Sequence, residues 1–129
     1  MKDTHCISIV EIYRTNYGSV SQCNKTNSYL LEYGGLVSSF KTSDFLDFIK
    51  RVNSIDLAEI ILSSSSVTDV TVLMPPYCER CFVLTLSDIL NLKELLLTAK
   101  FTLHLNSVIC ECLQPNLYSI YIKSVLFSY

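Results

Sequence analysis

Two of the three glycines in this 129-residue chain stand side by side, and they constrain the fold more than any other feature. The pair Gly34-Gly35 separates two runs of β-forming residues, 28–33 and 36–41. A glycine pair between such runs is typical of a two-residue hairpin turn, because glycine accepts the positive φ angles that the turn requires. We therefore predict an antiparallel β-hairpin at this point.

Other segments have the composition of strands. Asn24–Asn27 has turn chemistry, and Pro75-Pro76 ends a β-branched alternating run because proline cannot donate to a ladder. The candidate strands outside the hairpin are residues 5–13, 18–23, 67–74 and 81–86. Together with the hairpin they predict an antiparallel sheet of about five to six strands.

A helix is predicted directly after the hairpin. Thr42 or Ser43 can cap its start, and the charges at its two ends suit the helix dipole. One apolar stripe at the spacing of a helix comprises Phe45, Phe48, Ile49 and Val52, and the end charges are Asp44 and Asp47, then Lys50 and Arg51. Residues 54–62 fit either a short helix or a strand.

A second helix is predicted from Ser87-Asp88 towards Cys112, ending before Gln114-Pro115-Asn116. Its predicted inner stripe is Ile89, Leu92, Leu96, Ala99 and Leu103, with Leu95 beside them. We expect residues 114–129 to form a C-terminal extension that adds a strand, with a helix as the alternative.

The two helix starts resemble each other: residues 43–48 are echoed by residues 87–92, 44 positions later. This echo indicates either a duplicated ββα unit with two equivalent sites or the generic chemistry of strand-to-helix junctions, which we favour. In both cases the chain, residues 1–129, is expected to be a single α+β domain with two main helices packed on one face of the sheet.

Composition restricts the function classes. Half of the residues are hydrophobic, only 17% are charged, and the net charge is −2. A chain this apolar is expected to cover part of its surface by self-association, for instance as a homodimer, or with a protein partner. The absence of a basic cluster argues against nucleic acid. Because we find neither a secretory signal nor an uncharged run of ~18 residues, we expect a cytoplasmic chain that does not enter a membrane.

Cysteines are the strongest candidates for site chemistry. Cys78 and Cys81 form a CxxC, and Cys110 and Cys112 form a CxC; four thiolates of this kind can hold a structural zinc ion. A helix through the CxC would point its two thiols apart, and a CxxC leading into a strand is unlike a redox motif. We therefore favour reduced, partly buried cysteines, with zinc as the alternative and no cofactor or metal residue assigned.

No catalytic residue is assigned either. Cys6 with His5 or His104 would need an orienting group and oxyanion donors, and neither is visible. We interpret His104 as a histidine satisfied within the fold. The eight tyrosines leave open a third class, a small-molecule-binding enzyme or sensor, provided that a deep tyrosine-lined pocket exists.

Residues from about 18 to 103 resemble an uncharacterised family of small bacterial domains. The resemblance rests on Cys23, residues 29–33, residues 42–45, and residues 84–86 leading into 92–97. Members of that family tend to carry a CxxC near the first of these points, and this chain has Thr26 where the second cysteine would fall. The resemblance supports the order of the elements and implies no activity.

The predicted function is a non-enzymatic protein-interaction module that acts through an apolar surface, as an adaptor, an immunity or anti-defence factor, or an assembly subunit. The alternative is a zinc-stabilised regulatory domain that uses the CxxC and CxC cysteines.

Overall fold

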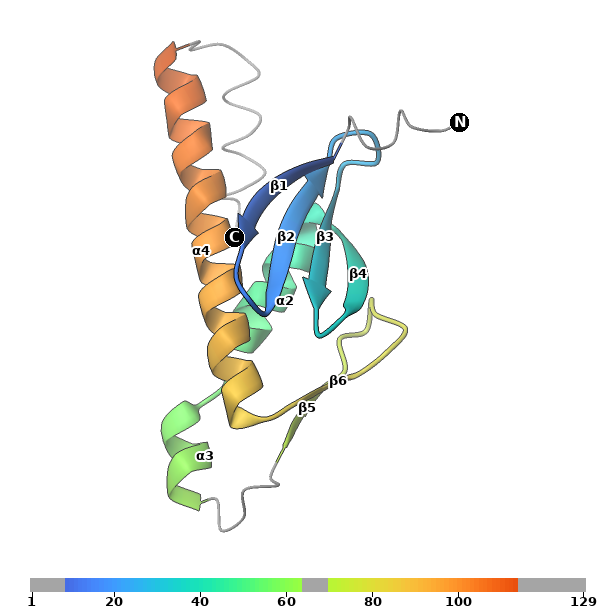
Figure 1. Cartoon of the computed structure of the whole chain (residues 1–129), viewed down its shortest axis with the longest axis vertical. Helices are drawn as coiled ribbons and strands as arrows, with labels where there is room; N and C mark the ends of the chain where they lie inside the picture. Colours follow the sequence, from blue (N-terminus) through green and yellow to red (C-terminus); the bar gives the residue numbers. More distant parts are fainter. Residues whose placement is uncertain (1–8, 64–69, 114–129) are drawn as a thin grey trace.

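The computed structural model describes residues 9–63 and 70–113, which begin with a four-stranded antiparallel sheet (Figure 1). Consecutive strands pair, in the order β1 (Ile9–Arg14), β2 (Gly18–Cys23), β3 (Ser28–Tyr33) and β4 (Leu36–Lys41). The α+β class is confirmed. In the described part of the chain the main sheet has four strands, in place of the five to six predicted.

The glycine pair forms the predicted hairpin turn between β3 and β4. Gly34 and Gly35 have φ angles of +61° and +81°, and Tyr33 pairs with Leu36 across a two-residue loop. Both values lie in the left-handed region, as a turn that continues the right-handed twist of the strands requires. Asn27, in the predicted turn between β2 and β3, has a φ of +53°.

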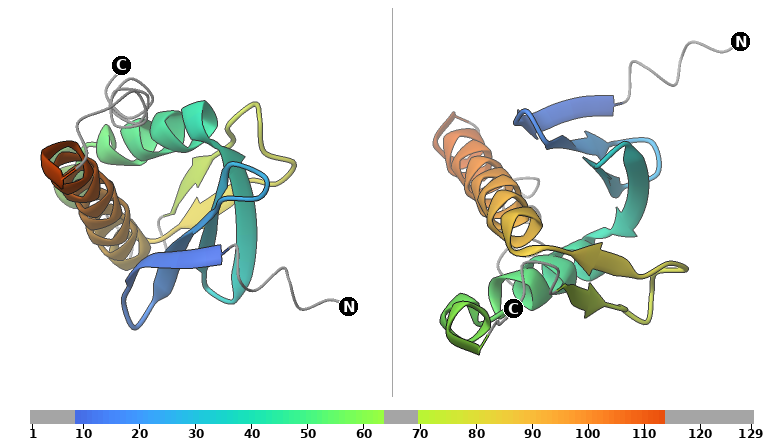
Figure 2. Two further views of the ribbon diagram at one scale, coloured as in Figure 1. Left: turned by 90° about the horizontal axis from the view of Figure 1, so that it is seen from above. Right: turned by 60° about the horizontal axis from the view of Figure 1, so that its bottom comes forward.

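The side chains on one face of the sheet form one side of the hydrophobic core. Val20 pairs with Leu31, and Tyr29 with Phe40, and all four side chains are buried. Two helices cover this face: α4 (Leu86–Leu113) contacts β1 and β2, while α2 (Thr42–Asn53) contacts β3 and β4 (Figure 2). The sheet and both helices therefore enclose one apolar cluster.

Helix α2 follows β4 without a linker and buries the predicted stripe. Asp44 lies in its first turn and Lys50 and Arg51 in its last, as the charge pattern indicated. The predicted cap is wrong: the N-cap residue is Lys41, which makes no side-chain capping hydrogen bond. Because β4 continues directly into the helix, Thr42 is already helical and cannot serve as its cap.

Aromatic rings join the sheet to the elements that cover it. The ring of Phe48 lies 5.0 Å from that of Phe40 on β4 and 4.9 Å from that of Phe82. Tyr29 stacks on Phe45 with ring centroids 4.8 Å apart. These contacts connect α2 to β3 and β4 of the main sheet and to β6, and they place α2 at the centre of the core.

The segment after α2 is helical, which settles the choice left open for residues 54–62. Helix α3 (Leu57–Ser63) begins after Asp56, whose carboxylate accepts a hydrogen bond from the Glu59 backbone N–H at 3.1 Å. Lys93 of α4 donates to the backbone carbonyls of Asn53 and Ile55, at 3.3 and 3.1 Å. The α2–α3 connection is thereby held against α4.

The remaining strands form a separate two-stranded ribbon, β5 (Thr71–Leu73) with β6 (Phe82–Leu84). They were expected to join the main sheet. Instead, Phe82 and Leu84 are buried in the core while Val83 between them is 57% exposed, so that the ribbon packs through one face of β6.

Helix α4 begins 44 residues after α2, as the sequence echo predicted, and each helix follows an antiparallel strand pair. The two junctions differ, however, because α4 has a side-chain cap and α2 has none. No helix among residues 9–63 and 70–113 is long and apolar enough to cross a membrane. The strand predicted within residues 114–129 lies outside the described residues.

Candidate interaction surface

The apolar residues of α4 extend around the whole helix. On the side that faces the sheet and α2, the predicted inner stripe is buried: Ile89, Leu92, Leu95, Leu96, Ala99 and Leu103. On the remaining surface the exposed apolar residues are Leu90, Leu97, Phe101, Leu105, Ile109 and Leu113. A surface helix normally has one apolar side and one charged side, and a helix that is apolar all round is normally covered all round.

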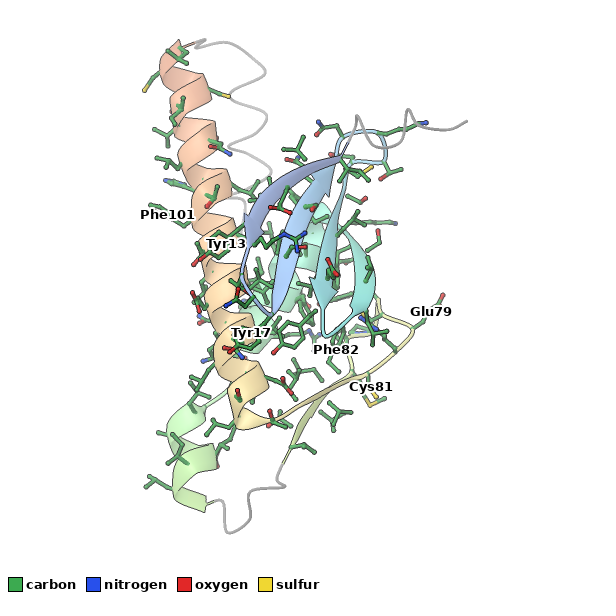
Figure 3. All side chains as sticks on the ribbon, viewed as in Figure 1. Tyr13, Tyr17, Glu79, Cys81, Phe82 and Phe101 are labelled. Atoms are coloured by element: carbon green, nitrogen blue, oxygen red, sulfur yellow. The ribbon has the colours of Figure 1, made fainter. Side chains whose placement is uncertain are left out.

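We define the outer face of α4 by six residues that recur at alternating spacings of four and three: Leu90, Glu94, Leu97, Phe101, His104 and Val108. At 100° per residue they lie along one line, roughly opposite the buried stripe. Leu90 is 50% exposed, Leu97 41% and Phe101 62%. Figure 3 shows Phe101 projecting from α4 on the side away from the sheet.

The start of α4 is fixed by a reciprocal cap. The Thr85 backbone N–H donates to Asp88 Oδ2 at 3.0 Å, and the Asp88 backbone N–H donates to Thr85 Oγ1 at 3.1 Å. Tyr33 of β3 also donates its hydroxyl to Asp88 Oδ1 at 3.0 Å. The sequence prediction started this helix at Ser87-Asp88; the residue that caps it is Thr85, two positions before Ser87.

These hydrogen bonds shift two pKa values. The bond from the Thr85 N–H is the main cause that lowers the pKa of Asp88, whereas burial, followed by the bond to Asp88, raises the pKa of Tyr33 to about 12. Because the folded-state pKa of Asp88 is depressed, the stability that it contributes is complete above about pH 4 and is lost as the pH falls through the folded value.

We expect Thr85→Ala to lower the free energy of unfolding by about 1 kcal/mol, since it removes one of the two capping bonds. Ser87→Ala is the matched control and should change the free energy of unfolding by less than about 0.5 kcal/mol, because Ser87 lies within the helix and its side chain is exposed to solvent. Urea denaturation of both variants measures the difference. An equal loss in the two variants would contradict the assignment of Thr85 as the cap.

The carboxylate of Asp47 joins α2 to the loop that follows β5. It accepts a hydrogen bond from the Tyr77 hydroxyl and another from Arg51 Nε, both at 2.6 Å. The Tyr77 bond and then the Arg51 bond lower the pKa of Asp47, while burial raises the pKa of Tyr77. A carboxylate held ionised by two donors is a weak base, so the role of this cluster is to stabilise the packing of the loop on α2.

Arg80 attaches the far end of the same loop. Its guanidinium donates to the Ser38 hydroxyl on β4 and lies 5.0 Å from the centre of the Phe82 ring. Both contacts are to residues within the same chain, on β4 and β6. An arginine over an aromatic face is a common stabilising pair, so Arg80 has a structural role.

The two cysteine motifs lie far apart. Cys78 and Cys81 are on the loop between β5 and β6, before α4 begins, whereas Cys110 and Cys112 are in the last turn of this 28-residue helix. Burial raises the pKa of the Cys78 thiol, which disfavours the thiolate that zinc needs. Among the described residues, no group of three or more His, Cys, Asp or Glu side chains could hold a metal ion.

The structure does not bring together the other residues that were considered for catalysis or small-molecule binding. His104 is exposed on the outer face of α4. His5 and Cys6 lie outside the described residues. A shallow depression beside α3 is lined by Asp56, Ala58, Glu59 and Leu62, with no tyrosine among these lining residues.

A scan against protein-family models, a search of curated proteins and a search of solved structures found no match. The resemblance to small bacterial domains therefore stays a prediction. The outer face of α4 was not predicted from the sequence. The signal was present, because Leu90, Leu97 and Phe101 fall outside the predicted inner stripe of a helix that the pattern already identified.

Proposed function

We propose that this chain is a non-enzymatic protein-interaction module, such as an adaptor, an immunity or anti-defence factor, or an assembly subunit, and that it acts in the cytoplasm. The apolar surface through which it binds is the outer face of α4. A second protein surface placed there would bury Leu97 and Phe101 and complete the cover of the helix.

The observation that carries this proposal is the exposure of large apolar residues on a helix whose opposite side is already buried. Fully burying one such side chain is worth about 1.5–3 kcal/mol relative to leaving it in water. The outer face thus holds enough unused burial energy to support a specific contact. The polar groups around Asp88 and Asp47, by contrast, make hydrogen bonds that join elements of the fold to one another.

The test is site-specific photo-crosslinking of the full chain in its native cell. A photoreactive amino acid at position 101 should give a discrete protein adduct, and Leu97→Glu in the same chain should abolish that adduct. Position 37 is the matched control, because Val37 is 63% exposed but lies on β4, away from α4.

Three results would contradict the proposal. The first is that position 101 gives no more adduct than position 37. The second is that the adduct persists with Leu97→Glu, and the third is that Leu97→Glu unfolds the isolated chain. The last result would mean that the face is packed within the chain itself. Circular dichroism and a thermal melt of the Leu97→Glu variant distinguish loss of binding from loss of fold.

A further inference from the structure

The buried side of α4 continues beyond the apolar stripe that packs on the sheet. Leu103 is the last buried apolar residue of that stripe. Ser107 and Cys110 follow it at spacings of four and three residues, which places them on the same side of the helix. Ser107 is only 2% exposed, although it lies within two turns of the helix end. Serine is mostly exposed in proteins, so burial at this position requires a segment that covers it.

The elements that pack on α4 lie lower along the helix. They are chiefly β1, β2, β6 and α2, and Figure 1 shows the last turns of α4 rising past the strands and past α2. On its other sides this part of the helix is open, because Leu105 is 44% exposed, Ile109 47% and Leu113 75%. The cover is therefore confined to the side that carries Ser107.

The hydroxyl of Ser107 adds a chemical condition. Its Oγ atom is buried and has no hydrogen-bond partner among the described residues. An unpaired hydroxyl in the interior costs free energy, and a polypeptide can remove this cost with a backbone N–H or carbonyl group. The covering segment is thus expected to combine apolar side chains, which pack beside Leu103, with polar backbone groups.

We infer that residues 117–127 of this chain fold back along the last turns of α4 and cover the side that carries Ser107 and Cys110. This surface lies apart from the outer face of α4, so the inference does not rest on the proposed function. Helix α4 ends at Leu113, and Pro115 cannot continue a helix. Ser107 lies about 9 Å back from Leu113 along the helix axis, a distance that about three extended residues span.

Position and composition select this segment from the parts of the chain that lie outside the described residues. Residues 64–69 connect α3 with β5, and both of these elements lie near the start of α4 (Figure 1). Residues 1–8 precede β1 and are mostly polar. The segment 117–127 follows α4 directly and has one charged residue, Lys123. Its apolar and aromatic residues are Leu117, Tyr118, Ile120, Tyr121, Ile122, Val125, Leu126 and Phe127.

Alkylation of the native thiols in the full, purified chain tests the inference. Cys110 is partly buried on the covered side, whereas Cys112 is exposed and lies about 200° further around the helix. With limiting iodoacetamide and tandem mass spectrometry, Cys110 should react about fivefold or more slowly than Cys112 in the wild type. The ratio should not change on dilution, because the cover belongs to the same chain.

The double variant Ile120→Asp/Val125→Asp is expected to uncover Cys110, so that its rate comes within about twofold of that of Cys112. These two positions lie on opposite faces of a strand and about 140° apart on a helix, so one of them meets α4 in either conformation. Asn116→Asp/Ser128→Asp is the matched control. It adds the same two charges on either side of the segment, removes no apolar side chain and should keep the wild-type ratio.

A second pair of variants tests the surface from the side of α4. Ser107→Glu places a charge beneath the cover and should also uncover Cys110. Asn106→Glu is its control, because Asn106 is exposed, and it should leave the ratio unchanged. The buried thiol of Cys23 on β2 reports global unfolding and should stay unreactive in every variant.

Three outcomes would overturn the inference. The first is that Cys110 and Cys112 react at equal rates in the wild type. The second is that Ile120→Asp/Val125→Asp leaves Cys110 as slow as in the wild type, which would mean that another segment covers Ser107. The third is that the Cys110 rate rises on dilution, which would mean that a second copy of the chain supplies the cover.

Discussion

Gly18→Ala is expected to cost at least about 3 kcal/mol of unfolding free energy, above the usual range for overpacking. A Cβ atom at position 18 would lie 2.2 Å from the backbone carbonyl oxygen of Glu32 and 3.3 Å from Leu95 Cδ2. The carbonyl belongs to the neighbouring strand and cannot rotate away, so β2 and β3 would have to separate beneath α4. Urea denaturation with circular dichroism measures the effect.

Gly34→Ala is the control for this prediction. Position 34 has nothing within 4 Å of an added Cβ, and its φ of +61° leaves only the strain of the left-handed region. That strain is about 1–2 kcal/mol for a residue with a side chain. If both alanine variants lost the same stability, the close approach of β2 and β3 at Gly18 would not be the reason that glycine is needed there.

The second large effect is expected from Phe48→Ala, which should lower the free energy of unfolding by about 3–5 kcal/mol. Phe48 is fully buried, and its ring lies between Phe40 of the sheet and Phe82 of the ribbon. Its removal leaves a cavity where three elements meet. We expect the β5–β6 ribbon to lose protection in hydrogen exchange before the main sheet does, because the ribbon has only one ladder of its own.

Phe101→Ala is the matched control, since it removes the same side chain from a position that is 62% exposed. At low protein concentration it should change stability by less than about 0.5 kcal/mol. A large loss at low concentration would show that Phe101 is packed within its own chain and would count against the proposed surface.

Local sequence patterns predicted the elements well where local chemistry decides the outcome. The hairpin follows from Gly34-Gly35, because a two-residue turn demands positive φ whatever surrounds it. Helix α2 follows from the spacing of Phe45, Phe48 and Val52, which only a helix places on one face. The inner stripe of α4 was predicted for the same reason.

The errors concern choices that local chemistry leaves open. Thr42 and Ser87 both have capping side chains, yet Lys41 and Thr85 are the N-cap residues, because the end of the preceding strand decides where helical φ and ψ angles begin. The segments around β5 and β6 were correctly predicted as strands. Whether they join the main sheet depends on Phe82 and Leu84 turning into the core, and this contact is remote in sequence.

The candidate interaction surface also depends partly on local sequence and partly on tertiary contacts. By itself the sequence determined the α+β class, the hairpin at the glycine pair, and the apolar repeats of α2 and α4, since turn geometry and side-chain periodicity are properties of short segments. Only the tertiary structure decided which apolar face of α4 is buried and which is exposed, and that the CxxC and CxC cysteines lie at opposite ends of that helix. The physical reason is that burial belongs to the neighbours of a residue, and those neighbours come from distant parts of the chain.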